Sequence, residues 1–321
     1  MSSSAPIVGL RPPAMRSLLI LEAVGELIKP PEFPFPDVRL QLWPQGTERG
    51  LTIFASTSVE VIHKVARREV DIAMVNPSGP LTVAYRGKGC FPTPVPIRAI
   101  AVMPSFDQIA FGVASATGLR SLADIKTRHY PLKLSLRAWR EHAVHLYVDE
   151  VLKAYGFSLA DIIKWGGKVA YDPHLPFEPE RLEPVRRGEM DAIFDEAVQH
   201  WISPAIESGM TILPLEEPIL QRLEDLGFRR SVLLREQFPG LGVDVPTLDF
   251  SGWPVYTHAD VDEQLIYRFC RALDARKSAI AWEGNGDLPL ATMCRDTPAG
   301  PLGIPLHPGA ERCWREAGYL G

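Results

Sequence analysis

Hydrophobic and polar positions along the chain predict short strands that alternate with amphipathic helices. Residues 38–43 alternate apolar and polar side chains, as a half-buried strand does. Residues 108–114 form a continuous apolar strand, and residues 140–155 place Val144, Tyr147 and Val151 on one helix face before Gly156 ends the helix. Further strands are predicted at residues 71–75, 97–102, 132–136, 190–194, 210–213 and 248–256, and further helices at residues 121–126, at residues 261–279 and from residue 59.

The order of these elements predicts an α/β protein. A chain in which strands and helices alternate builds parallel strands with helices on both faces of the sheet. The 321 residues are too many for one ordinary core and suit two lobes of about 150 residues each. The helix from residue 59 carries an expected capping box, in which Thr57 caps the helix and Glu60 reaches back.

Composition excludes several classes of protein. Hydrophobic residues make up 46% and charged residues 23%, as in a globular protein, and the net charge of −5 is opposite to that of a nucleic-acid-binding domain. The 30 prolines are spread along the chain, which indicates many loops rather than one extended linker. Four scattered cysteines without a CxxC pair indicate neither a zinc site nor redox chemistry.

The N-terminal region contains only a short apolar run. Residues 18–21 are apolar and Glu22 ends the run, whereas a secretory signal needs an apolar stretch of at least ~7 residues and a membrane span needs ~18. We therefore expect no direct membrane insertion. The chain is expected in the cytoplasm if the printed N-terminus is native, and in the periplasm if a leader has been removed.

Four segments resemble one known family. Residues 306–318 (LHPGAERCWREAG) are similar to the closing pattern of the TAXI solute receptors, which serve some TRAP transporters. Residues 56–76, 118–126 and 188–194 resemble three looser motifs of the same family. Three loops depart from it: residues 10–15 replace a glycine-rich loop, "TGGS" keeps only its serine, and "GSGT" becomes Glu-His-Ala-Val at residues 141–144.

The resemblance implies a type II periplasmic-binding-protein fold. Each of its two lobes is a mixed sheet flanked by helices, and two crossing segments join the lobes. Lobe one is expected to comprise residues 1–107 and 246–321, with the C-terminal helix, and lobe two residues 108–245. The resemblance further implies that a small solute, expected to carry a carboxylate, binds in the cleft between the lobes, and that a TRAP permease is a partner.

Candidate ligand residues follow from where strands end. Ligands of such sheets bind at the carboxyl ends of the strands, where loops lead into helix N-termini that attract anions. The hydroxyl-rich loop before residue 59 and the cationic loop before the helix 140–155 have this position, and so do two shorter segments after predicted strands. The candidates are Ser56, Thr57, Ser58, Asn76, Ser78, Arg137, Trp139, Arg140, His142 and Glu196.

Each candidate also has a structural interpretation. The serines and Thr57 cap helices in many proteins, and a tryptophan such as Trp139 is often part of a core. The guanidinium of Arg137 or Arg140 suits a ligand carboxylate, but either arginine can instead pair with a neighbouring acid. Asp195 and Glu196 are expected to pair with these arginines, and His307 is expected to begin a helix at Pro308.

Catalytic and metal-binding signatures are not found. Glu141-His142-x-x-His145 is not the zinc motif HExxH, and no GxSxG, Walker or GxGxxG motif occurs. We predict no metal, no cofactor and binding without turnover. The alternative is a cytosolic enzyme, for example a decarboxylase, or a ligand sensor on the same fold. His142 would then be the acid–base group, since its ordinary pKa lies near neutrality.

Overall fold

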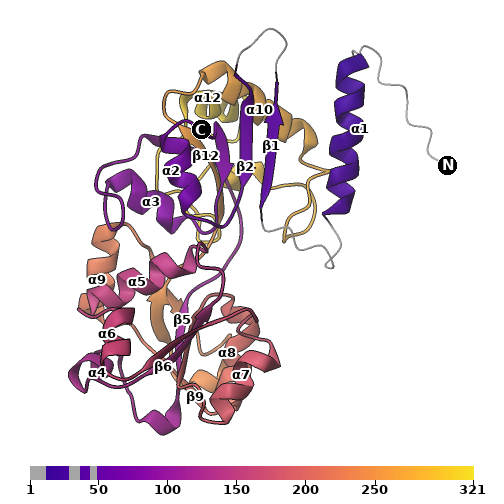
Figure 1. The fold of residues 1–321 in the computed structure, drawn as a ribbon. Coiled ribbons are helices and arrows are strands. Elements are labelled where there is room, and N and C mark those ends of the chain that lie inside the picture. Colours follow the sequence, from indigo (N-terminus) through magenta and orange to yellow (C-terminus); the bar gives the residue numbers. More distant parts are fainter. Residues whose placement is uncertain (1–11, 29–36, 44–48) are drawn as a thin grey trace, which may run out of the picture. The chain divides into compact units, whose positions relative to one another are not determined.

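A computed structural model describes residues 12–28, 37–43 and 49–321 (Figure 1). The chain divides after Val38 into two compact units. The first contains helix α1 (Pro12–Leu27), which includes the apolar run at residues 18–21. The described helices include none that is both long enough and apolar enough to cross a membrane.

The first sheet has five strands in the order β1-β2-β3-β12-β4. Strand β2 is parallel to β3, whereas β12 is antiparallel to both β3 and β4, so the sheet is mixed. Side chains alternate between its faces: Ile72 and Val255 pack with Trp314 of helix α12 (Pro308–Glu316), and Ala73 and Tyr256 belong to a different apolar cluster. The strands are β1 (Val38–Leu42), β2 (Leu51–Ala55), β3 (Ile72–Met74), β4 (Ile97–Met103) and β12 (Trp253–His258).

The second sheet also has five strands, in the order β7-β6-β8-β5-β9. Strand β6 is parallel to β7 and β8, and β5 is antiparallel to β8 and β9. In β6, Leu134 and Leu136 are fully buried and, being two residues apart, lie on the same face of the strand. The strands are β5 (Ala110–Ala114), β6 (Lys133–Arg137), β7 (Lys168–Asp172), β8 (Ala192–Asp195) and β9 (Met210–Leu213).

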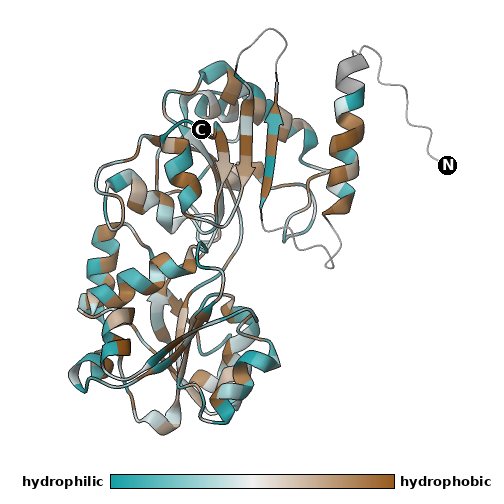
Figure 2. Cartoon of the chain, viewed as in Figure 1, coloured by the Kyte–Doolittle hydropathy of each residue, from teal (hydrophilic) through white to brown (hydrophobic). Residues whose placement is uncertain are grey.

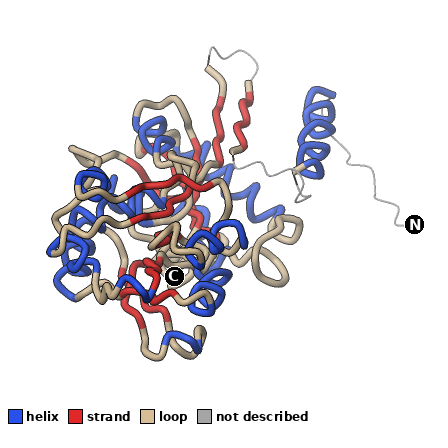
Figure 3. Tube along the Cα trace, turned by 60° about the horizontal axis from the view of Figure 1, so that its bottom comes forward, coloured by secondary structure: helices blue, strands red, loops and turns tan. Residues whose placement is uncertain are grey.

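Helices lie around the strands of both sheets (Figure 3) and carry apolar and polar positions on different sides (Figure 2). The helices that follow strands of the first sheet or close the chain are α2 (Glu60–Ala66), α3 (Gly79–Arg86), α10 (Glu263–Arg276), α11 (Leu290–Met293) and α12 (Pro308–Glu316). The helices between strands of the second sheet and beyond it are α4 (Leu122–Thr127), α5 (Val144–Ala154), α6 (Leu159–Lys164), α7 (Pro179–Arg186), α8 (Val198–Glu207) and α9 (Glu217–Leu226).

The chain passes between the two sheets twice. It leaves the first sheet after Met103 and enters the second at Ala110, and it returns between Leu248 and Trp253. Before the return, β10 (Arg230–Leu233) and β11 (Val245–Leu248) form a two-stranded antiparallel ribbon. Two mixed sheets, flanked by helices and joined by two crossing segments, confirm the predicted fold class. The lobe boundaries at 107/108 and 245/246 stay predictions.

Three local predictions need correction. The strand predicted over residues 248–256 is interrupted, because residues 249–252 form the second crossing. Helix α5 begins at Val144 rather than at residue 140, because the preceding loop pairs with another loop at His142. The capping box before α2 is absent: Val59 is the N-cap, and the Glu60 carboxylate pairs with Arg67 at 3.1 Å. The helix start at Pro308 is confirmed, with the His307 side chain accepting from the Gly309 N–H.

Candidate functional site

Loops from the carboxyl ends of both sheets meet in the folded chain. The loop after β2 and the loop after β6 form an antiparallel bridge between Ser58 and His142. In the same contact, the Ala143 N–H donates to the Thr57 carbonyl at 3.1 Å. Residues that lie about 85 positions apart in the sequence are therefore joined by backbone hydrogen bonds at the place where the strand pattern predicts ligand binding.

The hydroxyl groups of the first loop differ in their partners. The Ser56 Oγ accepts from the Ser58 N–H at 3.0 Å, and the Ser58 Oγ accepts from the Glu60 N–H at 3.2 Å. These two side chains therefore stabilise the loop and the start of α2. The Thr57 Oγ1 is buried and has no hydrogen-bond partner within the described ranges.

The loop after β3 faces the second crossing. The Asn76 side-chain amide donates to the Gly252 carbonyl at 3.2 Å, and the Ser78 N–H donates to the Ser251 carbonyl at 3.1 Å. The Ser78 hydroxyl is buried and, among the described residues, has no partner. Ser78 also lines a cavity of about 300 Å³ whose lining includes neither Ser58 nor His142.

Arg137 ends β6 and belongs to a buried ion-pair cluster. Its guanidinium bonds to Asp195 at 2.8 Å and also to Glu196. Asp195 is fully buried and accepts from Arg181, another fully buried side chain, at 2.6 Å. Burial by itself raises the pKa of Asp195, but the charges of Arg137 and Arg181 outweigh burial and lower that pKa. The ion pair expected as the alternative to ligand binding is therefore present.

Asp107 connects this cluster to the first crossing. Its carboxylate accepts from the N–H groups of Ala197 and Val198 at 2.8 and 3.2 Å, at the start of α8, and it shares a hydrogen bond with Glu196. Burial raises the pKa of both Asp107 and Glu196. The cluster therefore contains the three carboxyl groups of Asp107, Asp195 and Glu196 and the two guanidiniums of Arg137 and Arg181.

Arg140 differs from Arg137 in its surroundings. It is exposed, its guanidinium lies 4.0 Å from the centre of the Tyr171 ring, and no ion pair of Arg140 occurs in the part of the chain that the structure describes. Trp139 is half-buried, with its ring 5.8 Å from that of His142. An exposed cation stacked on an aromatic ring is available to a carboxylate at this site.

His142 is a structural side chain in this arrangement. Its Nδ1 accepts from the Val144 N–H at 3.2 Å, and its ring stacks on Phe250 with the centres 6.2 Å apart. Burial, and then the charge of Arg137, lowers the pKa of His142 to about 3. A histidine with this pKa stays neutral near pH 7 and is a weak base.

Sequence reasoning missed three charged residues here. Arg181 pairs with Asp195, Asp107 links the first crossing to α8, and Asp249 lies buried in the second crossing. The sequence could have indicated that Arg181 is buried, because it shares a helix face with the apolar Val185 four positions later. The sequence could also have indicated that Asp249 is buried, because it is the only charged residue among mostly apolar neighbours at residues 245–256.

No family profile matches the sequence. Solved structures with partial similarity include the protein Tv2483 bound to L-arginine (9% identity, TM-score 0.30, 68% of this chain and 64% of that one). Another is the glycine betaine, L-proline-binding protein ProX of Borrelia burgdorferi (11% identity, TM-score 0.35, 63% of this chain and 62% of that one). A third is apo YehZ of Escherichia coli (13% identity, TM-score 0.28, 83% of this chain and 86% of that one).

The chain thus spans a little under two thirds of the length of Tv2483 and of ProX. All three TM-scores lie below 0.5, and the fold is therefore described from the chain's own sheets. The protein is a two-sheet α/β protein in which loops after β2 and β6 form a bridge.

Proposed function

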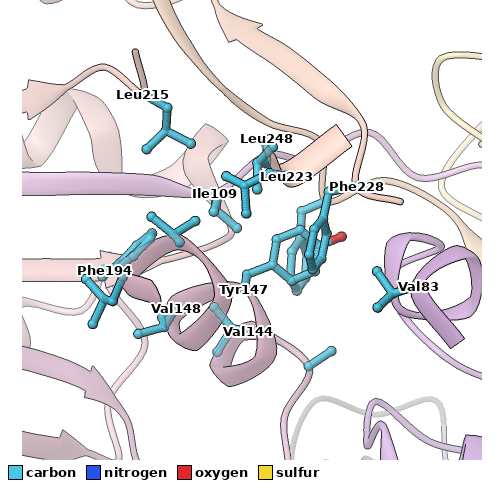
Figure 4. Close-up of a cluster of buried hydrophobic side chains, with 14 of the residues drawn as sticks. Val83, Ile109, Val144, Tyr147, Val148, Phe194, Leu215, Leu223, Phe228 and Leu248 are labelled. Atoms are coloured by element: carbon cyan, nitrogen blue, oxygen red, sulfur yellow. The ribbon is translucent and has the colours of Figure 1, made fainter. Parts of the chain in front are cut away.

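We propose that this protein binds a small solute between its two sheets and closes over it. The main support is the backbone contact between residues 57–58 and 142–143, which joins a loop of the first sheet to a loop of the second. The chain itself connects the two sheets by two crossing segments. Domains joined by two short segments close by bending at those segments. The described conformation is then the closed one, in which elements of both sheets share one apolar cluster (Figure 4).

The polar groups left over at this contact support a ligand. The Thr57 Oγ1 and the His145 Nε2 are buried without partners in the described ranges, and buried polar groups in folded proteins are nearly always hydrogen-bonded. Arg140 supplies a cation that forms no ion pair with the described residues. A solute with a carboxylate would pair with Arg140 and accept from Thr57.

The finer assignment rests on the sequence. The C-terminal motif at residues 306–318 resembles that of TAXI receptors, and we propose that the protein serves a TRAP permease in that manner. A receptor of this kind acts in the periplasm. The rewritten loops at residues 55–58 and 137–144 lead us to expect a solute other than the usual ligands of the family.

An enzyme or sensor is the second candidate, and one observation favours it. Buried carboxyl groups with raised pKa values, as in the pair Asp107 and Glu196, are frequent at catalytic sites. The acid–base group would then be this pair rather than His142, and the protein would act in the cytoplasm.

Native mass spectrometry of freshly purified protein separates the two candidates. A receptor releases a small molecule of constant mass, which is recovered unchanged after prolonged incubation with the protein. The recovered molecule should bind Arg140→Gln at least tenfold more weakly, and Arg187→Gln, an exposed control arginine, with unchanged affinity. Conversion of the molecule to a product that depends on Glu196 would overturn the receptor proposal.

A further inference from the structure

A second polar cavity lies apart from the Arg137 cluster. It has a volume of about 300 Å³ and is lined by the start of α3, the segment after α9, the second crossing and residues 301–303. Neither Arg137 nor Asp195 nor Glu196 lines it. Its floor consists of buried residues, among them Ser78, Phe228 and Asp249, and its mouth of exposed ones, among them Arg229 and Asp296.

Asp249 is the unusual group of this floor. Its side chain is about 7% exposed, it bonds to Ser251, and the described residues provide no ion pair for it. Burial raises the pKa of Asp249 to about 6, so the carboxyl group is still mostly ionised at pH 7.5. A buried carboxylate without a cation is costly, and a cation that binds in the cavity would offset this cost.

The two arginines that line this cavity, Arg86 and Arg229, form hydrogen bonds with groups other than Asp249. The Arg229 guanidinium pairs with Asp296 at 3.1 Å and donates to the Thr297 carbonyl at 3.2 Å. Arg86 donates to the Glu224 carbonyl at 2.9 Å. Both arginines lie at the exposed mouth, and their hydrogen bonds leave the carboxylate on the floor unpaired.

Two further features suit a small organic cation. The Ser78 hydroxyl is buried at the start of α3 and, in the described ranges, lacks a partner, so its oxygen can accept a hydrogen bond. The Phe228 ring forms an apolar wall and is held by Tyr147, with the ring centres 4.6 Å apart (Figure 4). The cavity therefore combines a carboxylate, a hydroxyl acceptor and an aromatic surface.

We propose that this cavity is a binding site for a small primary amine in its ammonium form. The ammonium group pairs with the Asp249 carboxylate and donates to the Ser78 hydroxyl, and the alkyl part lies against Phe228. The lining of this cavity includes neither Arg140 nor Thr57, the residues of the proposed solute site.

Isothermal titration calorimetry at pH 7.5 with three isosteric probes tests the proposal. We expect butylammonium to bind, and 1-butanol and butanoate to bind at least tenfold more weakly, because only the ammonium has a counter-ion. Asp249→Asn should weaken butylammonium binding at least tenfold while it keeps a cooperative thermal transition, and Ser78→Ala should weaken it several-fold.

Two mouth variants give effects of opposite sign. Arg229→Gln removes a competing cation and should strengthen butylammonium binding. Asp296→Asn releases Arg229 to pair with Asp249 and should weaken it. The proposal is overturned if butylammonium does not bind, if 1-butanol binds equally well, or if folded Asp249→Asn keeps the affinity. Binding of butanoate alone would overturn it as well, but would leave the carboxylate site at Arg140 standing.

Discussion

Two buried aspartates of this protein have opposite surroundings. Asp195 lies inside the second sheet with Arg137 and Arg181 as partners, and its pKa is lowered. Asp249 lies where the chain crosses between the sheets, without an ion pair in the described ranges, and its pKa is raised to about 6. Asp195 is thus paired within the second sheet, whereas Asp249 in the second crossing has no ion pair among the described residues. Asp107 in the first crossing, by contrast, bonds to the start of α8 and to Glu196.

Most of the buried neutral polar groups that lack a partner also lie outside the two sheets. Among the described residues, buried side-chain atoms without a hydrogen-bond partner occur at five positions: Thr57, Ser78, Gln108, His145 and Tyr256. Only Tyr256 lies within a sheet, and the other four lie in contact loops, in a crossing segment or at the start of α5. Unpaired groups are costly inside a rigid core. Their position between the sheets is the position that a ligand or a second conformation can reach.

The largest expected effect comes from breaking the paired cluster. Arg181→Met leaves Asp195 buried with one guanidinium in place of two, and we expect the free energy of unfolding to fall by about 3–5 kcal/mol. Urea denaturation at pH 7.5 measures this change. Arg186→Met, on the same helix but exposed, should change stability by no more than about 0.5 kcal/mol. Equal effects of the two substitutions would contradict a special role for the buried pair.

A smaller effect is expected from a steric change between the sheets. A Cβ atom on Gly79 of α3 would lie 2.2 Å from the Tyr147 hydroxyl of α5. Gly79→Ala should therefore destabilise the closed contact by about 1–3 kcal/mol. Hydrogen exchange should increase at residues 56–58 and 138–144.

Tyr147→Phe removes the clashing oxygen, so the double variant should recover part of this protection. Unchanged exchange in Gly79→Ala would show that the two sheets do not separate at this contact. The cluster around Asp195 should keep its protection in every one of these variants, because it lies within the second sheet.

Opposite pKa shifts predict opposite pH dependence for the two aspartates. The folded pKa of Asp195 is lowered, so its contribution to stability is present above the unfolded pKa near 4 and is lost on acidification. The folded pKa of Asp249 is raised to about 6, so its contribution falls as the pH rises from about 4 to 6, and the penalty persists at pH 7.5.

Asp249→Asn should therefore be more stabilising at pH 7.5 than at pH 5, by about 1 kcal/mol. Urea midpoints of wild type and variant at the two pH values measure it. Asp225→Asn, an exposed control on α9, should show no such difference. A greater gain at pH 5 would contradict the ionised state assigned to Asp249.

The fold was predictable because it depends on repeated patterns. Short apolar runs, and alternation at residues 38–43, predicted most of the strands, and the helix start at Pro308 followed from the proline itself. The wrong secondary-structure predictions fall in segments whose backbone conformation depends on contacts with residues far away in the sequence. Residues 138–143 have helical composition but pair with the loop after β2, and residues 249–252 look like a strand but form a crossing.

The candidate site was predictable only in part. The sequence indicated the loops at residues 56–58 and 137–142, because both precede helices, and the structure brings these loops together. It also indicated that Asp195 and Glu196 pair with Arg137. It did not indicate that Arg181 and Asp107 would join this cluster, because they reach it from distant segments. Burial and pairing depend on the fold as a whole, and local spacing carries little information about them.

The smallest effect is expected at Thr57. Its Oγ1 is buried without a partner among the described residues, so Thr57→Val removes an unpaired hydroxyl and should change the free energy of unfolding by less than about 0.5 kcal/mol or slightly raise it. The matched control is Thr257→Val in β12, where the hydroxyl donates to the Asp71 carbonyl at 2.6 Å. That substitution removes a buried hydrogen bond and should cost about 1–2 kcal/mol. Urea denaturation separates the two variants. If Thr57→Val costs as much as Thr257→Val, the Thr57 hydroxyl has a partner in the folded protein, and the division between paired sheet interiors and unpaired contact loops fails at this residue.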